Sequence, residues 1–255
     1  MKFCNLIFNL SFIFGLLVFI SSCTKKEPIE PIIEPVYVEP TIPSFILSLE
    51  PRYNGEAFEF GKNYTNHMDQ IIKFEFFKFY LSDITLTTNE DSVVTISDVE
   101  LFDLEKNHDV EKQIPVGMYK SISFAVGLDS LTNHDSDPNT FAAEHPLSYA
   151  QNTHWGWASL YKFMQIEGRV DEVESDFLQK AFSYHTGFDE LYRPVTIETS
   201  FEVDTLENNL TLILNIDGVF DAVSSVDMFN ENASHALTPI ARKLSDNIAD
   251  SFEIN

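Results

Sequence analysis

Several segments of the chain alternate hydrophobic and polar residues with the two-residue period of a β-strand. Residues 119–126 place three apolar side chains on one face, and residues 210–216 carry leucine or isoleucine at every second position. Residues 195–203 alternate in the same way. Successive side chains of a strand point to opposite faces, so each segment is predicted to bury one face and expose the other.

The longest hydrophobic run, residues 71–86, changes the face of its apolar side chains midway. Phe74 and Phe76 alternate with charged residues, and Phe77 begins a second series of opposite parity. One extra residue in a strand produces such a change. The run therefore predicts a strand with a β-bulge at Phe76-Phe77.

Two further segments complete the predicted strands, and helical signals are fewer. Residues 44–49 read as a first strand ending at Pro51, and residues 92–104 hold one or two strands. The acidic residues 171–182 could form a short helix. A closing helix is predicted after Pro239 from apolar residues at i, i+4 spacing: Ile240, Leu244, Ile248 and Phe252. The pattern predicts an all-β fold, an antiparallel β-sandwich with a few short helices and a C-terminal helix.

The N-terminus has the pattern of a lipoprotein signal peptide over residues 1–22. Lys2 precedes an apolar run, residues 6–20, that is too short for a membrane span of about 20 residues. Ile20-Ser21-Ser22-Cys23 then matches a lipoprotein cleavage site, which predicts lipidation at Cys23. The alternative is an uncleaved membrane helix. We expect an exported protein, periplasmic or held at the outer membrane by its lipid anchor.

Residues 23–43 interleave prolines with glutamates, a composition that favours an extended tether with no further role. Residues 44–255 are predicted to form one domain. The mature chain keeps one cysteine, Cys23, which precedes this domain, because Cys4 is removed with the signal peptide. The domain therefore has no disulfide and no thiolate metal ligand. With 16 Lys and Arg against 40 Asp and Glu, the net charge of −24 makes nucleic-acid binding unfavourable.

Candidate chemistry is concentrated between residues 128 and 187. His145, His154 and His185 flank the two tryptophans of the chain, Trp155 and Trp157. Imidazole is a common ligand of copper and zinc, and histidines from different loops can build a metal site. The alternatives are structural histidines, and tryptophans that share one strand face in the core or in a surface aromatic strip.

The order of motifs resembles the MbnP-like family, the methanobactin-associated periplasmic proteins and their lipoprotein relatives. The most specific matches are His154-Trp155-Gly156-Trp157 and Tyr184-His185-Thr186-Gly187. Other matching segments are residues 61–66, 79–84, 116–119, 124–129, 137–139, 145–147, 161–163 and 166–168. The resemblance covers residues 44–255. At residues 81–84 the chain reads Leu-Ser-Asp-Ile where relatives usually have Ile-Ser-Asn-Ile, a conservative difference.

The resemblance implies a β-rich copper-binding protein of the cell envelope. The residues themselves show no recognisable catalytic set, so we do not expect an enzyme. His154 and His185 are the first-choice metal ligands that the resemblance implies, and His145 and His235 the second. It also implies a partner, a di-haem MauG-like peroxidase, and oxidation of a tryptophan, Trp155 or Trp157. A second hypothesis is a non-metal binding or adhesion module that displays the tryptophans to a glycan or protein.

Overall fold

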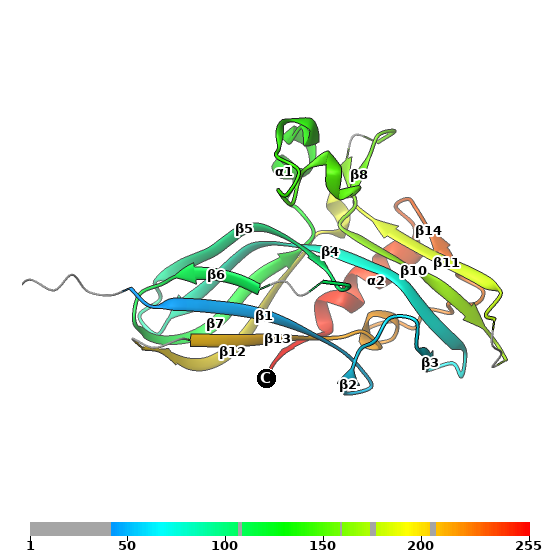
Figure 1. Cartoon of the computed structure of the whole chain (residues 1–255), viewed down its shortest axis with the longest axis horizontal. Coiled ribbons are helices and arrows are strands. Elements are labelled where there is room, and N and C mark those ends of the chain that lie inside the picture. The colour runs from blue at the N-terminus through cyan, green and yellow to red at the C-terminus, as the bar shows by residue number, and fades with distance from the viewer. Residues whose placement is uncertain (1–41, 107–108, 159, 174–176, 205–207) are drawn as a thin grey trace, which may run out of the picture. The chain divides into compact units, whose positions relative to one another are not determined.

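A computed structural model describes residues 42–106, 109–158, 160–173, 177–204 and 208–255 (Figure 1). The predicted signal peptide, Cys23 and nearly all of the tether lie outside these residues. The chain divides into two units, residues 1–39 and 40–255, and the second unit is the subject here. Among the described residues, no helix is long and apolar enough to cross a membrane.

Two large sheets form most of this unit, and a third sheet has only two strands. The larger sheet has the strand order β12-β7-β4-β10-β11-β14, with β3 and β5 also paired to β4, and the smaller has the order β15-β13-β1-β2, with β6 on β1. The strands of the larger sheet are β3 Asn63–Thr65, β4 Ile71–Thr88, β5 Val93–Asp103, β7 Gly117–Val126, β10 Met164–Asp171, β11 Lys180–Thr186, β12 Arg193–Val203 and β14 Ala233–Ser234. Those of the smaller are β1 Ser44–Tyr53, β2 Glu56–Ala57, β6 Asp109–Gln113, β13 Asn208–Asn215 and β15 Phe252–Ile254.

The inner faces of the two sheets meet in one aromatic-rich core. Phe77, Phe79 and Ile122 come from the larger sheet, and Leu47 and Leu212 come from the smaller one; all five are buried. Burial of such surface is the main driving force of folding. The predicted β-sandwich is confirmed.

The pairing departs from a purely antiparallel pattern in two places. β1 runs parallel to β13, and β11 runs parallel to β14. Both pairs join segments far apart in the sequence, so no hairpin turn dictates their direction.

The first strand is longer than predicted. β1 continues beyond Pro51 to Tyr53, and the Pro51 carbonyl accepts a hydrogen bond from the Phe58 amide at 3.0 Å.

The predicted β-bulge in β4 is confirmed to within one residue. Phe76 pairs with Glu167 of β10 and Phe74 pairs with Gly168, which leaves Glu75 as the extra residue. The irregularity lets Phe74 and Phe77 both enter the core. A strand of regular pleat would place two residues three apart on opposite faces.

The helix predicted for residues 171–182 is wrong. Asp171 ends β10 and Lys180 begins β11, and the described residues between them are not helical. The two strands form an antiparallel hairpin. Alternating burial of Phe182 and Tyr184 against the core outweighs the helix propensity of the acidic residues that precede them.

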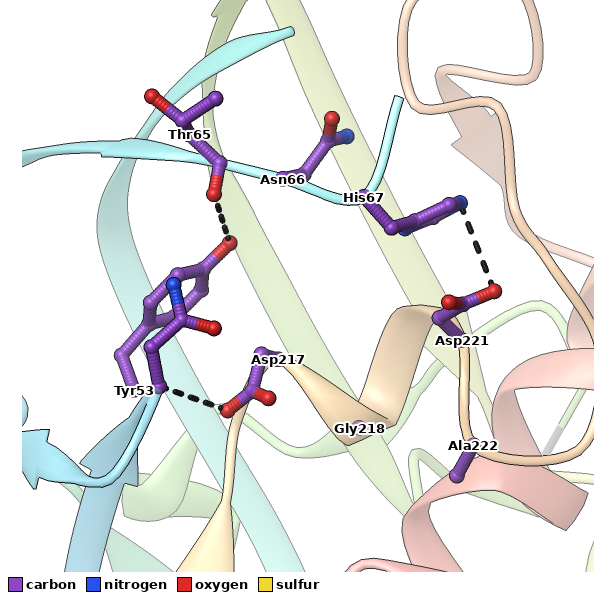
Figure 2. A pocket seen from close by; sticks show the side chains of 9 residues that line it. Tyr53, Thr65, Asn66, His67, Asp217, Gly218, Asp221 and Ala222 are labelled. Atoms are coloured by element: carbon purple, nitrogen blue, oxygen red, sulfur yellow. Dashed lines mark hydrogen bonds and ion pairs between the residues drawn. The ribbon is translucent and has the colours of Figure 1, made fainter. Parts of the chain in front are cut away.

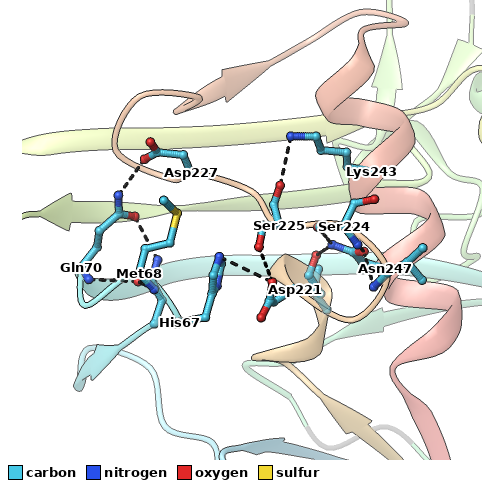
Figure 3. Close-up of polar contacts among 12 residues, drawn as sticks. His67, Met68, Gln70, Asp221, Ser224, Ser225, Asp227, Lys243 and Asn247 are labelled. Atoms are coloured by element: carbon cyan, nitrogen blue, oxygen red, sulfur yellow. Dashed lines mark hydrogen bonds and ion pairs between the residues drawn. The ribbon is translucent and has the colours of Figure 1, made fainter.

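The predicted C-terminal helix is α2, Pro239–Asp250, and it begins one residue after Thr238, whose Oγ1 accepts a hydrogen bond from the Ala241 amide. Leu244 and Ile248 are buried as expected, but Phe252 belongs to β15. Asn247 is also buried, and its Oδ1 accepts hydrogen bonds from the amides of two residues in the preceding loop, Val223 and Ser224 (Figure 3). This side chain fastens the helix to that loop.

Gly168 supplies a direct test of the β4–β10 packing. A Cβ at this position would lie 2.1 Å from the Lys73 carbonyl oxygen, whereas a Cβ at Gly156 would meet nothing within 4 Å. We expect Gly168→Ala to lower the free energy of unfolding by about 3 kcal/mol, because the strands must separate to admit the methyl group. Gly156→Ala is the control. Urea unfolding of both variants is the measurement, and equal stabilities would contradict the described packing.

Candidate functional site

The chain between β7 and β10 forms an excursion that packs on the outer face of the larger sheet. It contains α1 Ser130–Asp135, the 3-10 turns η1 Pro138–Thr140 and η2 Tyr149–Gln151, and the short hairpin β8 His154–Trp155 with β9 Leu160–Tyr161. Figure 1 shows α1 and β8 standing above β4. Tyr80 of β4 anchors the excursion, since its buried hydroxyl donates to the Pro146 carbonyl oxygen at 2.8 Å.

The two tryptophans do not share a strand face. Strand β8 ends at Trp155, and Trp157 lies in the turn that leads to β9. Trp155 is 6% exposed and Trp157 is 69% exposed, although their ring centroids are 5.6 Å apart. Trp155 covers Gly187, where a Cβ would come within 2.7 Å of the indole ring. Trp155 is therefore a packing residue, and Trp157 is a surface residue that leans on it.

His145 occupies a structural position. Its Nδ1 accepts a hydrogen bond from the Leu147 amide at 3.0 Å, and its ring stacks on Phe141 at a centroid distance of 4.2 Å. The local turn thus uses one ring nitrogen and one ring face of this residue.

His154 lines a cavity of about 390 Å³ on the excursion, together with His134, Asp137 and Tyr149. Its ring meets Tyr161 edge to face at 5.0 Å. Hydrogen bonds from Asn139 lower the pKa of the Asp137 carboxyl, and the charge of His154 adds to this effect. The cavity therefore presents an ionised carboxylate beside an imidazole.

His185 and His235 form the closest histidine pair that the structure provides among the predicted ligands. His235 directly follows β14, which pairs with β11, and the two ring centroids are 4.7 Å apart. Nε2 of His235 lies 2.9 Å from the Ser183 Oγ, and Nε2 of His185 lies 3.4 Å from the same oxygen. Two imidazole nitrogens thus converge on one hydroxyl group.

Glu167 orients one ring of this pair. Its Oε1 lies 2.8 Å from Nε2 of His185, whose side chain is 15% exposed. Burial lowers the pKa of His185 and outweighs the opposing effect of the Glu167 hydrogen bond. The imidazole is therefore neutral at neutral pH. Because a carboxylate accepts hydrogen bonds, Nε2 carries the proton donated to Glu167, and Nδ1 carries the electron pair that can bind a metal.

Gln165 lies beside the pair on the same face of the sheet. In the register of the larger sheet it stands between Lys78 of β4 and His185 of β11, and directly opposed residues share a face. Its side chain is almost fully buried, and Oε1 accepts no hydrogen bond from any described residue. Lys78 is engaged elsewhere, in an ion pair with Asp103 at 3.3 Å.

These side chains fit a metal that prefers nitrogen donors, with two imidazoles as the principal ligands. The part of the chain that the structure describes contains no group of three or more His, Cys, Asp or Glu side chains arranged to hold a metal ion. The two first-choice ligands lie on different hairpins. His154 of β8 pairs with Tyr161 of β9, whereas His185 of β11 pairs with Gln165 of β10. The structure thus pairs His185 with His235.

Sequence reasoning did not identify Glu167, Ser183 or Gln165 as site residues. The available signal was their two-residue spacing: Gln165 and Glu167 share one face of β10, Ser183 and His185 share one face of β11, and the register brings these two faces to the same side of the sheet. Recognition of this signal required prediction of the β10–β11 hairpin, which the acidic residues 171–182 obscured.

A second polar cavity, of about 480 Å³, lies between the β1–β2 turn and the segment after β13 (Figure 2). His67 faces Asp221, with 3.7 Å between Nε2 and Oδ1. Asp217 accepts a hydrogen bond from the Asn54 amide at 3.0 Å, and Tyr53 donates to the Thr65 carbonyl oxygen at 3.1 Å. Contacts within the protein thus engage much of its polar lining.

Comparison with known proteins gives one family and one solved structure. The family profile described as MbnP matches residues 43–238. The solved structure of MbnP from Methylosinus trichosporium aligns with a TM-score of 0.52 at 13% identity, over 83% of this chain and 97% of the other. No curated protein matches the chain. The structural likeness supports the fold, and the profile match over most of the chain shows that this protein belongs to the MbnP family.

Proposed function

We propose that this protein is a copper-binding protein of the cell envelope and that His185 and His235 hold the metal. The observation that carries the proposal is the close pairing of the two imidazoles, whose ring centroids lie 4.7 Å apart, while Glu167 accepts a hydrogen bond from Nε2 of His185 and leaves Nδ1 as its electron-pair donor. Membership in the MbnP family supports the choice of metal, in agreement with the copper-binding function implied by the sequence motifs.

The chemistry of the donors favours copper among the divalent metals. Imidazole suits copper and zinc, and copper(II) stands above zinc in the Irving–Williams order. His185 is kept neutral by burial and does not need to lose a proton from its cationic form before it binds. The strongly acidic chain also raises the concentration of cations near its surface.

The first test compares histidine variants in a copper titration of the mature protein. We expect about one copper per chain, and a loss of affinity of at least tenfold in His185→Ala and in His235→Ala, because each removes one of two principal donors. His145→Ala is the matched control, since that imidazole caps a turn. His154→Ala tests the alternative ligand that the motifs imply.

A folded wild-type protein that takes up no copper would reject this function. Exposed Trp157 and Tyr149 favour the second candidate, a non-metal binding module, in that case. That candidate requires ligand binding that survives chelator treatment and is lost in Trp157→Ala.

Trp155 is the better placed tryptophan for oxidation that affects the metal. Its ring covers Gly187, two residues after His185, whereas Trp157 projects from the turn. We propose that a partner di-haem peroxidase oxidises Trp155. Electrons would leave Trp155 through the exposed ring of Trp157, which lies against it and would face the partner. Peptide mass spectrometry of protein from the native host should find added oxygen on Trp155 and none in a Trp157→Ala variant. Oxidation confined to Trp157 would contradict this assignment.

We further propose that the protein is exported and anchored by lipid at Cys23. The lipoprotein cleavage pattern around this residue supports the anchor. We expect Cys23→Ala to lose incorporation of a labelled fatty acid and to accumulate as the longer, uncleaved precursor, because Cys23 is both the predicted acylation site and part of the predicted cleavage site. Fatty-acid labelling and immunoblots measure these two changes, and label retained in the variant would contradict the anchor.

A further inference from the structure

We propose that Gln165 is a third donor to the metal held by His185 and His235, and that its amide oxygen makes the site favour copper(II) over copper(I). The inference rests on the proposed copper function and names a residue that neither the motifs nor the histidine pairing identified.

The register of the larger sheet places Gln165 beside the histidine pair. It lies directly opposite His185, so the two side chains leave the same face of the β10–β11 hairpin. The Cβ atoms of directly opposed residues are about 5 Å apart. The Gln165 side chain can therefore reach the space beside the imidazole of His185.

The state of the Gln165 amide indicates that its oxygen has a ligand role. The residue is 3% exposed, and its Oε1 accepts no hydrogen bond from the described residues. Burial of an amide oxygen without a partner is unfavourable, so native proteins rarely retain one without a compensating function. The flanking Lys78 forms an ion pair with Asp103 and makes no hydrogen bond to this oxygen.

Glu167 and Gln165 then have different tasks. Glu167 Oε1 contacts Nε2 of His185 at 2.8 Å and orients the ring, which makes it a positioning residue. Gln165 offers an uncharged oxygen that forms no hydrogen bond with any residue the structure describes. Glutamine oxygen serves as a weak axial ligand in copper sites built from two histidines and a cysteine, where the axial ligand tunes the reduction potential, and it could take a similar place here beside two histidines.

The donor type predicts a preference between oxidation states. Amide oxygen is a hard donor, and copper(II) accepts hard donors more readily than copper(I) does. Loss of this oxygen should weaken copper(II) binding and leave copper(I) binding, which two imidazoles can satisfy, nearly unchanged. The reduction potential of the bound metal should rise as a result.

The test measures copper(II) and copper(I) affinities separately, by competition with chromophoric chelators, in the full mature protein. We expect Gln165→Leu to weaken copper(II) binding about tenfold and to change copper(I) binding by less than about threefold. Its copper(II) electron paramagnetic resonance spectrum should also change. Gln165→Glu keeps an oxygen at the same position and should restore copper(II) binding. Gln179→Leu, on the exposed β10–β11 connection, is the matched control.

The outcomes separate this inference from the function on which it rests. If His185→Ala and His235→Ala lose copper while Gln165→Leu retains wild-type affinity and spectrum, the third donor is wrong and the copper function stands. If Gln165→Leu weakens both oxidation states equally and thermal unfolding shows a destabilised protein, the residue acts in packing and the inference is also overturned. If the folded wild type takes up no copper, the proposed function itself fails.

Discussion

The inward packing of alternate residues in the β10–β11 hairpin is the constraint on which the candidate site depends. Ile166, Phe182 and Tyr184 are buried in the core between the sheets. Because a strand alternates its faces, their neighbours Ser183 and His185 must leave the opposite face. A register slip of one residue would direct the aromatic rings outward and the histidine into the core, so the core specifies the site.

Two glycines permit the close approaches that this arrangement requires. Gly168 lets β10 pass against the β4 backbone at the bulge, and Gly187 lets Trp155 lie against the end of β11. A side chain at either position would collide with a backbone carbonyl oxygen at just over 2 Å. The excursion is thus held near the histidine pair by steric fit, with Tyr80 adding a hydrogen bond from the sheet.

Local pattern was sufficient to predict much of the fold but could not predict the partners within the site. The parity change at Phe76-Phe77 located the bulge, and the Leu244 and Ile248 spacing located the C-terminal helix. Alternation specifies a face for each residue without naming the strand beside it. The pairing of His185 with His235 depends on the parallel contact of β11 with β14, which no local pattern encodes. The same limitation concealed Gln165, whose proposed role comes from its position opposite His185 on the adjacent strand.

The parallel contact between β11 and β14 also has a kinetic consequence. Ser183 and His235 are 52 positions apart in the sequence, and the connection between them includes β12 and β13, which belong to different sheets. Contacts of such sequence separation form late, because the entropy of loop closure is lost before the contact is gained. The two imidazoles therefore come together late in folding, and a chain in which β14 has not yet joined β11 presents each histidine separately.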